Sequence, residues 1–386
     1  MARIKTSPTG AALALAAELR AAGRDIIGLG AGEPDFDTPQ AIKDAAIRAI
    51  NGGATKYTPV DGTAELKAAI QRKFSRDNQL QFSPAEIIVS CGAKQAIYNL
   101  CLALLDPEDE AIIPSPYWVS YPDMVKLSDA IPVIIETGIE QNFRITAAQL
   151  ADAIGPKTRL LILNSPCNPT GSSYSRAEFE TLGAVLEKHP RIVVVSDEIY
   201  EPIHWGIEPF VSFAAACPGI RDRVVTVNGV SKAYAMTGWR IGYAAGPATL
   251  IAAMTTIQSQ STSNACSVAQ QAAIAALDGD QQVVADMVRD YRDRHDYIVG
   301  ALNDIPGFHC RPGEGTFYAF PRVSGALAHL GLRDDVALTS YLIDRANVAV
   351  VPGSAFGAPG YLRLSFACSM ATLEEATKRI KRAVSA

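Results

Sequence analysis

The chain is organised around the stretch Val224-Val225-Thr226-Val227-Asn228-Gly229-Val230-Ser231-Lys232-Ala233-Tyr234-Ala235-Met236-Thr237-Gly238-Trp239-Arg240-Ile241-Gly242-Tyr243. Its β-branched start predicts a buried strand, after which small residues surround one lysine. Apolar surroundings lower the pKa of an amine, and the neutral amine then acts as a nucleophile or a base. The plain alternative is a lysine in a solvated loop, so the rest of the chain has to decide between the two.

Length and composition bound the class of protein. The chain has 386 residues, which predicts two domains. Hydrophobic residues make up 48% and charged residues 19%, which is typical of a globular protein. The net charge is −5 with both signs interspersed, so neither nucleic acid nor a membrane surface is an expected partner. No run of about 18 apolar residues occurs, so we expect no transmembrane helix.

Cysteines and histidines give no sign of a disulfide framework or a metal site. The seven cysteines form no C-x-x-C pair, which predicts free thiols in a reducing cytoplasm. The five histidines show no ligand spacing, so no metal is expected. Near the N-terminus, Arg3 and Lys5 precede an apolar run that imitates a secretory signal. Glu18 and Arg20 end that run, so we expect a helix over residues 11–22 after an N-terminal arm.

Predicted strands and helices alternate between residues 84 and 302. Besides the opening strand, strands are expected at 87–90, 111–113, 132–135, 159–163, 192–195 and 241–245, and helices at 93–105, 175–188 and within 247–302. This alternation predicts an α/β fold whose mostly parallel sheet is covered by helices on both faces. Short strands at 316–320, 348–351 and 362–366, with helices at 334–346 and 371–384, predict a smaller α+β unit.

The first fifty residues contain a misleading glycine pattern. Gly28, Gly30 and Gly32 follow a predicted strand at 26–29 with the spacing of a dinucleotide-binding loop. That loop must open a helix, whereas Pro34 and Asp35 make a turn, so we reject a nicotinamide-dependent dehydrogenase. A helix is expected up to about Gly52, with Thr38 as N-cap and Pro39 as its first residue. The expected division is an arm of residues 1–12, a small domain of 13–45 and 290–386, and a large domain of 46–289, with a helix near 281–303 as the bridge.

Functional side chains follow the predicted strands where each strand ends. They are Gly92, Ala93 and Lys94 at a helix start, then Trp118, Asn168, Asp197 and Tyr200, then Lys232 with Arg240 eight residues on. Ligands of open α/β sheets bind outside the carboxyl ends of the strands, so we expect one pocket to hold this set. Each residue has a structural alternative, such as Trp118 in the core, Asp197 as a helix cap or Arg240 in a surface ion pair. The joint pattern favours a site.

The set suits a flat, phosphorylated nitrogen heterocycle that carries an aldehyde. Backbone N–H groups of residues 92–94, with the charge of Arg240, can bind a phosphate. Trp118 can stack on the ring, and Asp197 can hold a ring nitrogen protonated. Asn168 and Tyr200 can bond a ring oxygen, and Lys232 can form a Schiff base.

Six motifs spread over the chain match one family. They are Ala31-Gly32-Glu33-Pro34-Asp35-Phe36, Lys56-Tyr57-Thr58-Pro59, Asn164-Ser165-Pro166-Cys167-Asn168-Pro169-Thr170-Gly171, Ser196-Asp197-Glu198-Ile199-Tyr200, Ser231-Lys232-Ala233 with Thr237-Gly238-Trp239-Arg240-Ile241-Gly242, and Tyr361-Leu362-Arg363-Leu364-Ser365. With them the chain resembles the class I, fold type I aminotransferases that depend on pyridoxal 5'-phosphate.

The resemblance adds roles that spacing alone does not give. It implies that Arg363 clamps the substrate α-carboxylate, with backbone from Gly32, and that Trp118 and Asn168 face the substrate as well as the cofactor. It implies that Tyr57 reaches the cofactor phosphate of a neighbouring subunit, hence a homodimer with shared sites. Ser231 joins the cofactor contacts. Many relatives have serine where this chain has Gly229, so phosphate binding is expected to rest more on Lys94, Arg240 and backbone.

Within the family the chain is similar to bacterial aspartate aminotransferases of the branch that includes prephenate-using members. In that branch the position of Lys94 meets the distal carboxylate of a dicarboxylic substrate, that of Lys5 is associated with prephenate, and that of Thr9 with substrate contact. The alternative is that Lys94 serves only the phosphate and Lys5 is a charge on the arm. The stretch Thr6-Ser7-Pro8-Thr9 departs from the branch's usual Pro-Ser-Ala-Thr, so the geometry of the arm stays open.

The implied reaction moves the amino group of L-aspartate to 2-oxoglutarate by a ping-pong mechanism, in which Lys232 moves the α-proton, assisted by Asp197 and Tyr200. Its setting would be cytoplasmic amino acid biosynthesis. Rivals on the same scaffold are an aromatic or kynurenine aminotransferase and a β-lyase that acts on cysteine conjugates. A regulator that senses the cofactor would carry a DNA-binding domain before the first motif, where this chain has a segment of only about 30 residues that is not basic overall.

Overall fold

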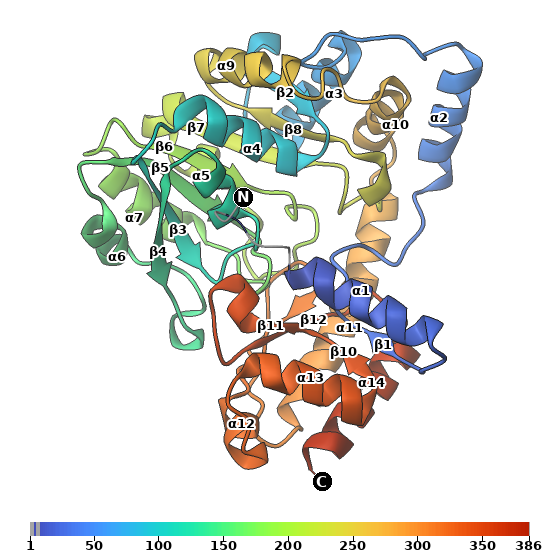
Figure 1. Ribbon diagram of the computed structural model, residues 1–386. Helices are drawn as coiled ribbons and strands as arrows, with labels where there is room; N and C mark the ends of the chain where they lie inside the picture. Colours follow the sequence, from blue (N-terminus) through green and yellow to red (C-terminus); the bar gives the residue numbers. More distant parts are fainter. Residues whose placement is uncertain (1–3, 5–7, 386) are drawn as a thin grey trace.

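A seven-stranded sheet forms the centre of the computed structural model, which describes residue 4 and residues 8–385 (Figure 1). Its strands, in spatial order, are β2 (Ile87–Ser90), β8 (Gly242–Ala245), β7 (Val224–Gly229), β6 (Val193–Asp197), β5 (Thr158–Asn164), β3 (Glu110–Ser115) and β4 (Ile131–Glu136). Neighbouring strands are parallel except around β8, which is antiparallel to β2 and β7. The predicted mostly parallel sheet is confirmed.

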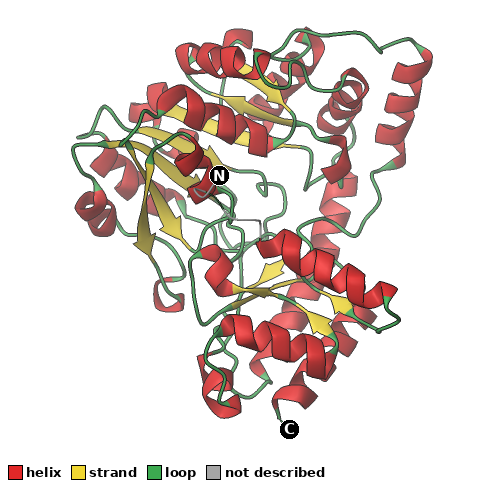
Figure 2. Cartoon of the chain, viewed as in Figure 1, coloured by secondary structure: helices red, strands yellow, loops and turns green. Residues whose placement is uncertain are grey.

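The sheet is apolar on both faces because helices cover both (Figure 2). Successive residues of β5 alternate between the two sides. Leu160 and Ile162 belong to the core formed with α4 (Ala93–Leu104), α5 (Tyr121–Leu127) and α9 (Ala248–Ser259). Leu161 and Leu163 belong to the core on the other side, with α3 (Ala64–Lys73) and α7 (Arg176–Leu186). This burial on both faces explains the continuous hydrophobic runs of the strands.

A second lobe contains short strands and C-terminal helices (Figure 1). Its elements are β1 (Ile27–Gly28) parallel to β10 (Val348–Ala349), the antiparallel order β11 (Val351–Pro352), β12 (Leu362–Ser365) and β9 (Tyr318–Ala319), and the helices α1 (Pro8–Ala21), α12 (Ser324–Leu330), α13 (Asp335–Ala346) and α14 (Met370–Val384). The helix α11 (Gln282–Asn303) runs between the two lobes. The exact domain limits, including an arm of residues 1–12, stay a prediction.

Several element boundaries differ from the sequence-based expectation. The first helix begins at Pro8 rather than at residue 11. The helix α2 (Gln40–Asn51) has Pro39, not Thr38, at its N-cap, because the Thr38 hydroxyl donates instead to the Ala235 carbonyl at 2.6 Å. The helix expected from residue 175 is present as α7, and Ser175 is its N-cap, since its side chain accepts from the backbone N–H of Glu178.

The remaining elements are short, apart from α10. They are the π-helix Phe74–Asn78, the 3-10 turns Pro84–Glu86, Ile139–Gln141, Pro218–Arg223, Thr237–Trp239 and Gly353–Phe356, and the helices α6 (Ala147–Ala153), α8 (Phe213–Ala216) and α10 (Ser267–Asp278). Among the residues that the structure describes, no helix is both long enough and apolar enough to cross a membrane.

Candidate active site

A pocket of about 360 Å³ opens where the carboxyl ends of the central strands face the second lobe. It is lined by Gly30, Gly32, Glu33, Ala93, Lys94, Trp118, Tyr121, Asn164, Asn168, Asp197, Ile199, Tyr200, Ser231, Lys232, Thr237, Arg240, Tyr318 and Arg363. Asn164 and Asp197 are the last residues of β5 and β6, and Lys232 lies three residues beyond β7. This is the edge at which open α/β sheets bind ligands.

Lys232 is the lysine of the organising stretch. Its Nζ donates a hydrogen bond to the Gly32 carbonyl oxygen. Burial, together with the cation of Arg363, lowers the pKa of Lys232 to about 8. A neutral amine is therefore accessible near physiological pH, as nucleophilic or basic chemistry requires.

Asp197 presents a buried carboxylate to the pocket, with 4% of its surface exposed. The Tyr121 hydroxyl donates to its Oδ2 at 2.6 Å, and the Ile199 backbone N–H donates to Oδ1 at 3.2 Å. Burial raises the pKa of Asp197 to about 6, and both hydrogen bonds oppose that rise. The side chain thus stays ionised at neutral pH because neighbours stabilise its charge.

Arg363, on β12, brings a cation from the second lobe into the pocket. Its guanidinium donates to Asn168 Oδ1 at 3.1 Å and to the Gly30 carbonyl at 2.8 Å. The Cζ atom lies 4.4 Å from the ring centroid of Tyr318. Nε is buried and has no partner within the described chain. Burial lowers the pKa of Arg363, yet a guanidinium stays charged, so this donor suits a carboxylate ligand.

Two tyrosines meet beside Arg363. The hydroxyls of Tyr200 and Tyr318 lie 2.8 Å apart, and both rings are buried. Burial and the Tyr318 neighbour raise the pKa of Tyr200 well above its usual value, so the phenol stays protonated and can donate.

Another group of pocket residues lies at the start of α4. Gly92 has φ +88°, and a Cβ at this position would overlap the Arg240 guanidinium, so only glycine allows the close approach. The first N–H groups of a helix lack intrahelical partners, which favours an anion here. Lys94 is exposed, and its Nζ lies 4.8 Å from the Trp118 ring centroid. Burial of part of the side chain and the Arg240 charge lower the pKa of Lys94.

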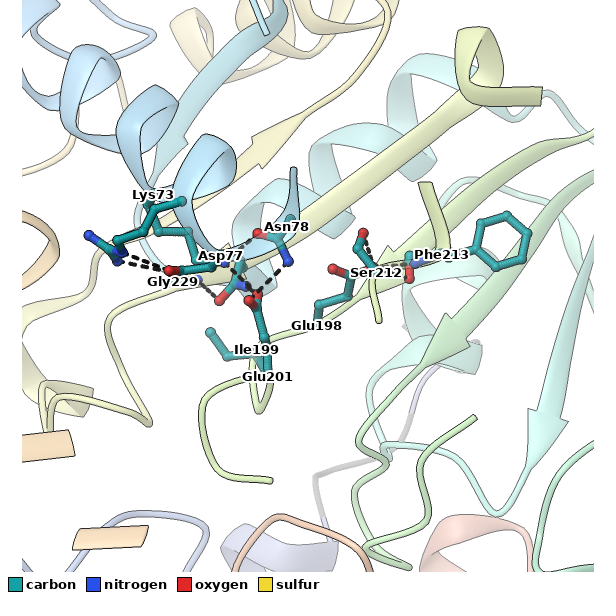
Figure 3. A network of polar contacts seen from close by, with 12 residues as sticks. Lys73, Asp77, Asn78, Glu198, Ile199, Glu201, Ser212, Phe213 and Gly229 are labelled. Atoms are coloured by element: carbon teal, nitrogen blue, oxygen red, sulfur yellow. Dashed lines mark hydrogen bonds and ion pairs between the residues drawn. The ribbon is translucent and has the colours of Figure 1, made fainter. Parts of the chain in front are cut away.

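A buried polar network supports the ends of β6 and β7 (Figure 3). Glu201 accepts hydrogen bonds from Lys73, from Asn78 at 2.9 Å and from Asn228 at 2.7 Å. The Asn228 side chain in turn accepts from the Gly229 N–H at 2.8 Å. The network therefore joins the turn that follows Asp197 to the loop that leads to Lys232.

Glu198 lies next to this network and is completely buried. Its Oε1 accepts from Ser196, Ser212 and the Phe213 N–H, while Oε2 has no partner within the described chain. Burial and the nearby Glu201 charge raise the pKa of Glu198 to about 8. At neutral pH this side chain is a neutral carboxylic acid.

The structure brings together most of the residues that the sequence singled out. Lys232, Asp197, Tyr200, Asn168, Arg363, Gly32, Trp118, Ala93, Lys94, Ser231 and Arg240 line one pocket, and Gly92 immediately precedes Ala93. Tyr57 is 92% exposed and is not among the lining residues. Lys5 lies outside the described residues, and Thr9 lies in α1 with its side chain undescribed.

Gly229 has a packing reason. A Cβ at this position would lie 3.0 Å from Gly242 Cα, Ile199 Cδ1 and the Ile241 carbonyl oxygen. The neighbours of such a Cβ would have to move by a few tenths of an ångström, so the absence of a side chain at Gly229 lets β7 and β8 lie close together.

Sequence reasoning missed five polar residues of the pocket: Glu33, Tyr121, Asn164, Thr237 and Tyr318. The sequence does indicate Asn164 as a pocket residue, because it ends β5 in the same way that Asp197 ends β6. Tyr121 follows Trp118 by three residues and begins α5, so only the turn after β3 directs it inward. Tyr318 lies on a two-residue strand too short to show an alternating pattern.

The fold and the pocket define an α/β enzyme whose site contains a lysine of lowered pKa and a buried arginine. Residues 24–380 match the family model described as aminotransferase class I and II. The chain belongs to this family, and it is a pyridoxal-phosphate-dependent aminotransferase.

Similar proteins agree over nearly full length. The aspartate/prephenate aminotransferase of Nitrosomonas europaea is 56% identical over 98% of this chain and 96% of that protein. The aspartate aminotransferase of Geobacillus stearothermophilus is 51% identical over 99% of this chain and 97% of that protein. The crystal structure of the aspartate aminotransferase from Rhizobium meliloti is 47% identical with a TM-score of 0.96, covering 99% of this chain and 97% of that chain.

The residues present fit the cofactor of the family. Asp197 supplies an acceptor for a ring N–H, and the start of α4 with Arg240 supplies donors for a phosphate. Lys232 supplies an amine for an aldehyde, and Arg363 has an N–H of its guanidinium unpaired within the described chain. The pocket volume lies in the range of small-molecule sites.

Proposed function

We propose that the enzyme transfers the amino group of L-aspartate, or of a similar dicarboxylic amino acid, to 2-oxoglutarate, and that prephenate is a further acceptor. The observation that carries this proposal is the charge of the pocket: Lys232 shares it with the cations of Lys94, Arg240 and Arg363. One cation can serve the cofactor phosphate and two remain for the two carboxylates of the substrate.

Lys232 is proposed as the group that moves the proton. Pyridoxal phosphate, when bound, supplies an aldehyde for an amine and a ring that withdraws electrons from the substrate α-carbon. With a pKa of about 8, the Lys232 amine can accept the α-proton and then return it as an ammonium group. Because Lys232 lies among half-buried and buried residues, few water molecules compete for that proton.

The other proposed cofactor contacts fall into groups according to the part of the cofactor that each would bind. Asp197 would accept a hydrogen bond from the protonated ring nitrogen, and Trp118 would pack against the ring. Asn168 and Tyr200 would donate hydrogen bonds to the ring oxygen. The phosphate would be held by a separate group consisting of Gly92, Ala93, Ser231 and Arg240, which leaves Lys94 for the substrate.

The proposed substrate contacts are Arg363 with Gly32 for the α-carboxylate and Lys94 for the distal carboxylate. Arg363 is oriented by Asn168 and Gly30, so its planar fork is fixed before a ligand arrives. Lys5 and Thr9, in the N-terminal segment, are proposed to contact the substrate. The similarity to proteins named aspartate/prephenate aminotransferase supports this proposal.

We also propose a homodimer in the cytoplasm. Tyr57 is 92% exposed, and on α2 Ile47 and Ile50 are 53% and 55% exposed. This exposed apolar face supports the proposal that a second copy of the chain packs against it. Tyr57 would then reach the active site of that second copy. The seven free cysteines support a reducing compartment.

A panel of amino donors tests the proposed function. The purified holoenzyme is mixed rapidly with L-aspartate, phenylalanine or β-chloroalanine, and with prephenate as acceptor for the aminated form, while the visible cofactor band is followed. We expect aspartate to bleach the band fastest. If phenylalanine reacts fastest, the enzyme is an aromatic aminotransferase and the proposal is wrong. If β-chloroalanine releases pyruvate, the enzyme is a β-lyase. The Lys232→Ala variant should not turn over, and near wild-type turnover would contradict the role of Lys232.

A further inference from the structure

Tyr121 is a pocket residue that touches a proposed cofactor contact, Asp197, through a short and buried hydrogen bond. Its hydroxyl lies 2.6 Å from Asp197 Oδ2, and 1% of its surface is exposed. The Asp197 Oδ1 atom has a weaker donor, the Ile199 N–H at 3.2 Å. A hydroxyl that donates to a carboxylate away from water is among the stronger hydrogen bonds in proteins.

We propose that Tyr121 is a positioning residue that keeps Asp197 charged and aimed into the pocket, so that the cofactor ring nitrogen keeps its proton. The inference rests on the proposed role of Asp197. Tyr121 is itself fixed, because its N–H donates to the Trp118 carbonyl at 3.0 Å and its ring packs edge-on against Trp118 at 5.3 Å. One turn thus places both the aromatic plate and the donor to the carboxylate.

The charge of Asp197 depends on this donor because burial works against it. Burial raises the pKa of Asp197 to about 6, and the hydrogen bond from Tyr121 is the largest opposing influence. The other titratable groups that face Asp197 are Lys232 from the loop after β7, Tyr200 after β6 and Cys167 after β5. Of these, Lys232 is the group whose charge favours the carboxylate.

Without the Tyr121 hydroxyl, the proton shared between the ring nitrogen and Asp197 should move toward the carboxylate. The ring would then withdraw electrons less strongly, and proton removal from the substrate would slow. Because Tyr121 acts through Asp197, the kcat should fall while the KM for aspartate stays unchanged. We expect a loss of roughly 10- to 100-fold in kcat for Tyr121→Phe.

The direct measurement is ¹⁵N NMR of holoenzyme loaded with pyridoxal phosphate labelled at the ring nitrogen, recorded from pH 6 to 9. In the wild type the resonance should report a protonated ring, and in Tyr121→Phe it should move toward the unprotonated position. The matched control is Tyr174→Phe, which removes another buried tyrosine hydroxyl, one that accepts from the Ile145 N–H at 2.9 Å. It should leave the ring resonance unchanged.

Each outcome of the NMR measurement either supports or overturns the proposed role of Tyr121. A wild-type resonance in Tyr121→Phe, or an equal shift in both variants, overturns the inference and leaves the proposed function intact. A wild-type protein with an unprotonated ring overturns the role of Asp197 and the inference with it. If Tyr121→Phe does not fold, 3,5-difluorotyrosine at position 121 keeps the shape and strengthens the donor. It should then raise the pH at which the ring loses its proton above that of the wild type, and an unchanged or lower value would overturn the inference.

Discussion

The two groups of cations in the pocket are built differently. Arg363 is 2% exposed, hydrogen-bonded to Asn168 and to backbone, and packed on the Tyr318 ring. Lys94 and Arg240 are exposed, and Lys94 contacts an aromatic face at 4.8 Å instead of a fixed acceptor. A fixed cation selects a ligand group that every substrate shares, whereas a cation on a free side chain can adapt to groups that differ among substrates. The contrast predicts separate roles in recognition.

The largest effect is expected at the buried cation. Arg363→Lys replaces a planar fork by a single ammonium group and removes the packing on Tyr318. We expect kcat/KM to fall about 10³-fold for aspartate and to a similar extent for phenylalanine, because both carry an α-carboxylate. Steady-state kinetics with both donors measures this. Arg322→Lys, which changes an exposed arginine paired with Glu140, is the matched control and should retain wild-type kinetics.

A smaller and selective effect is expected at the exposed cation. Lys94→Ala should lower kcat/KM for aspartate about 10-fold and leave phenylalanine nearly unchanged, since only aspartate has a distal carboxylate. Lys94→Arg should restore part of the loss. An equal loss with both donors would assign Lys94 to the phosphate instead, and a cofactor titration of the variant would then show weaker binding.

The smallest effect is expected beneath the pocket, at Glu198. Its folded-state pKa of about 8 lies above the usual value for a glutamate, so the folded chain holds a proton that the unfolded chain releases. Stability therefore falls as the pH rises from about 4.5 to about 8. Glu198→Gln should remove this slope and raise the Tm at pH 8 by about 2–4 °C. Thermal unfolding of both proteins between pH 5 and pH 9 tests this, and parallel curves would contradict it.

Sequence reasoning recovered the part of the site that follows from the sheet. Asp197, Lys232 and Asn168 could be placed together because the carboxyl ends of parallel strands meet at one edge. Tyr121 and Tyr318 could not, because a loop turn and a two-residue strand orient them. Local preference predicts Thr38 as a helix cap, but its hydroxyl donates to the Ala235 carbonyl, 197 residues away in the chain. The contact of Tyr57 with a neighbouring site stays a prediction, because it depends on a second chain.

Two glycines at the junction of β7, β8 and α4, Gly229 and Gly242, leave little room for a side chain. Any side chain at Gly242 would collide with the backbone of Gly92 and Ala93, and one at Gly229 would press on β8. Gly242 does not line the pocket, yet a substitution there would displace the anion-binding start of α4. The resulting loss would be one of cofactor affinity, which mass action can offset. A variant at Gly242 should therefore regain activity in excess pyridoxal phosphate, although every chemical group of the active site is intact.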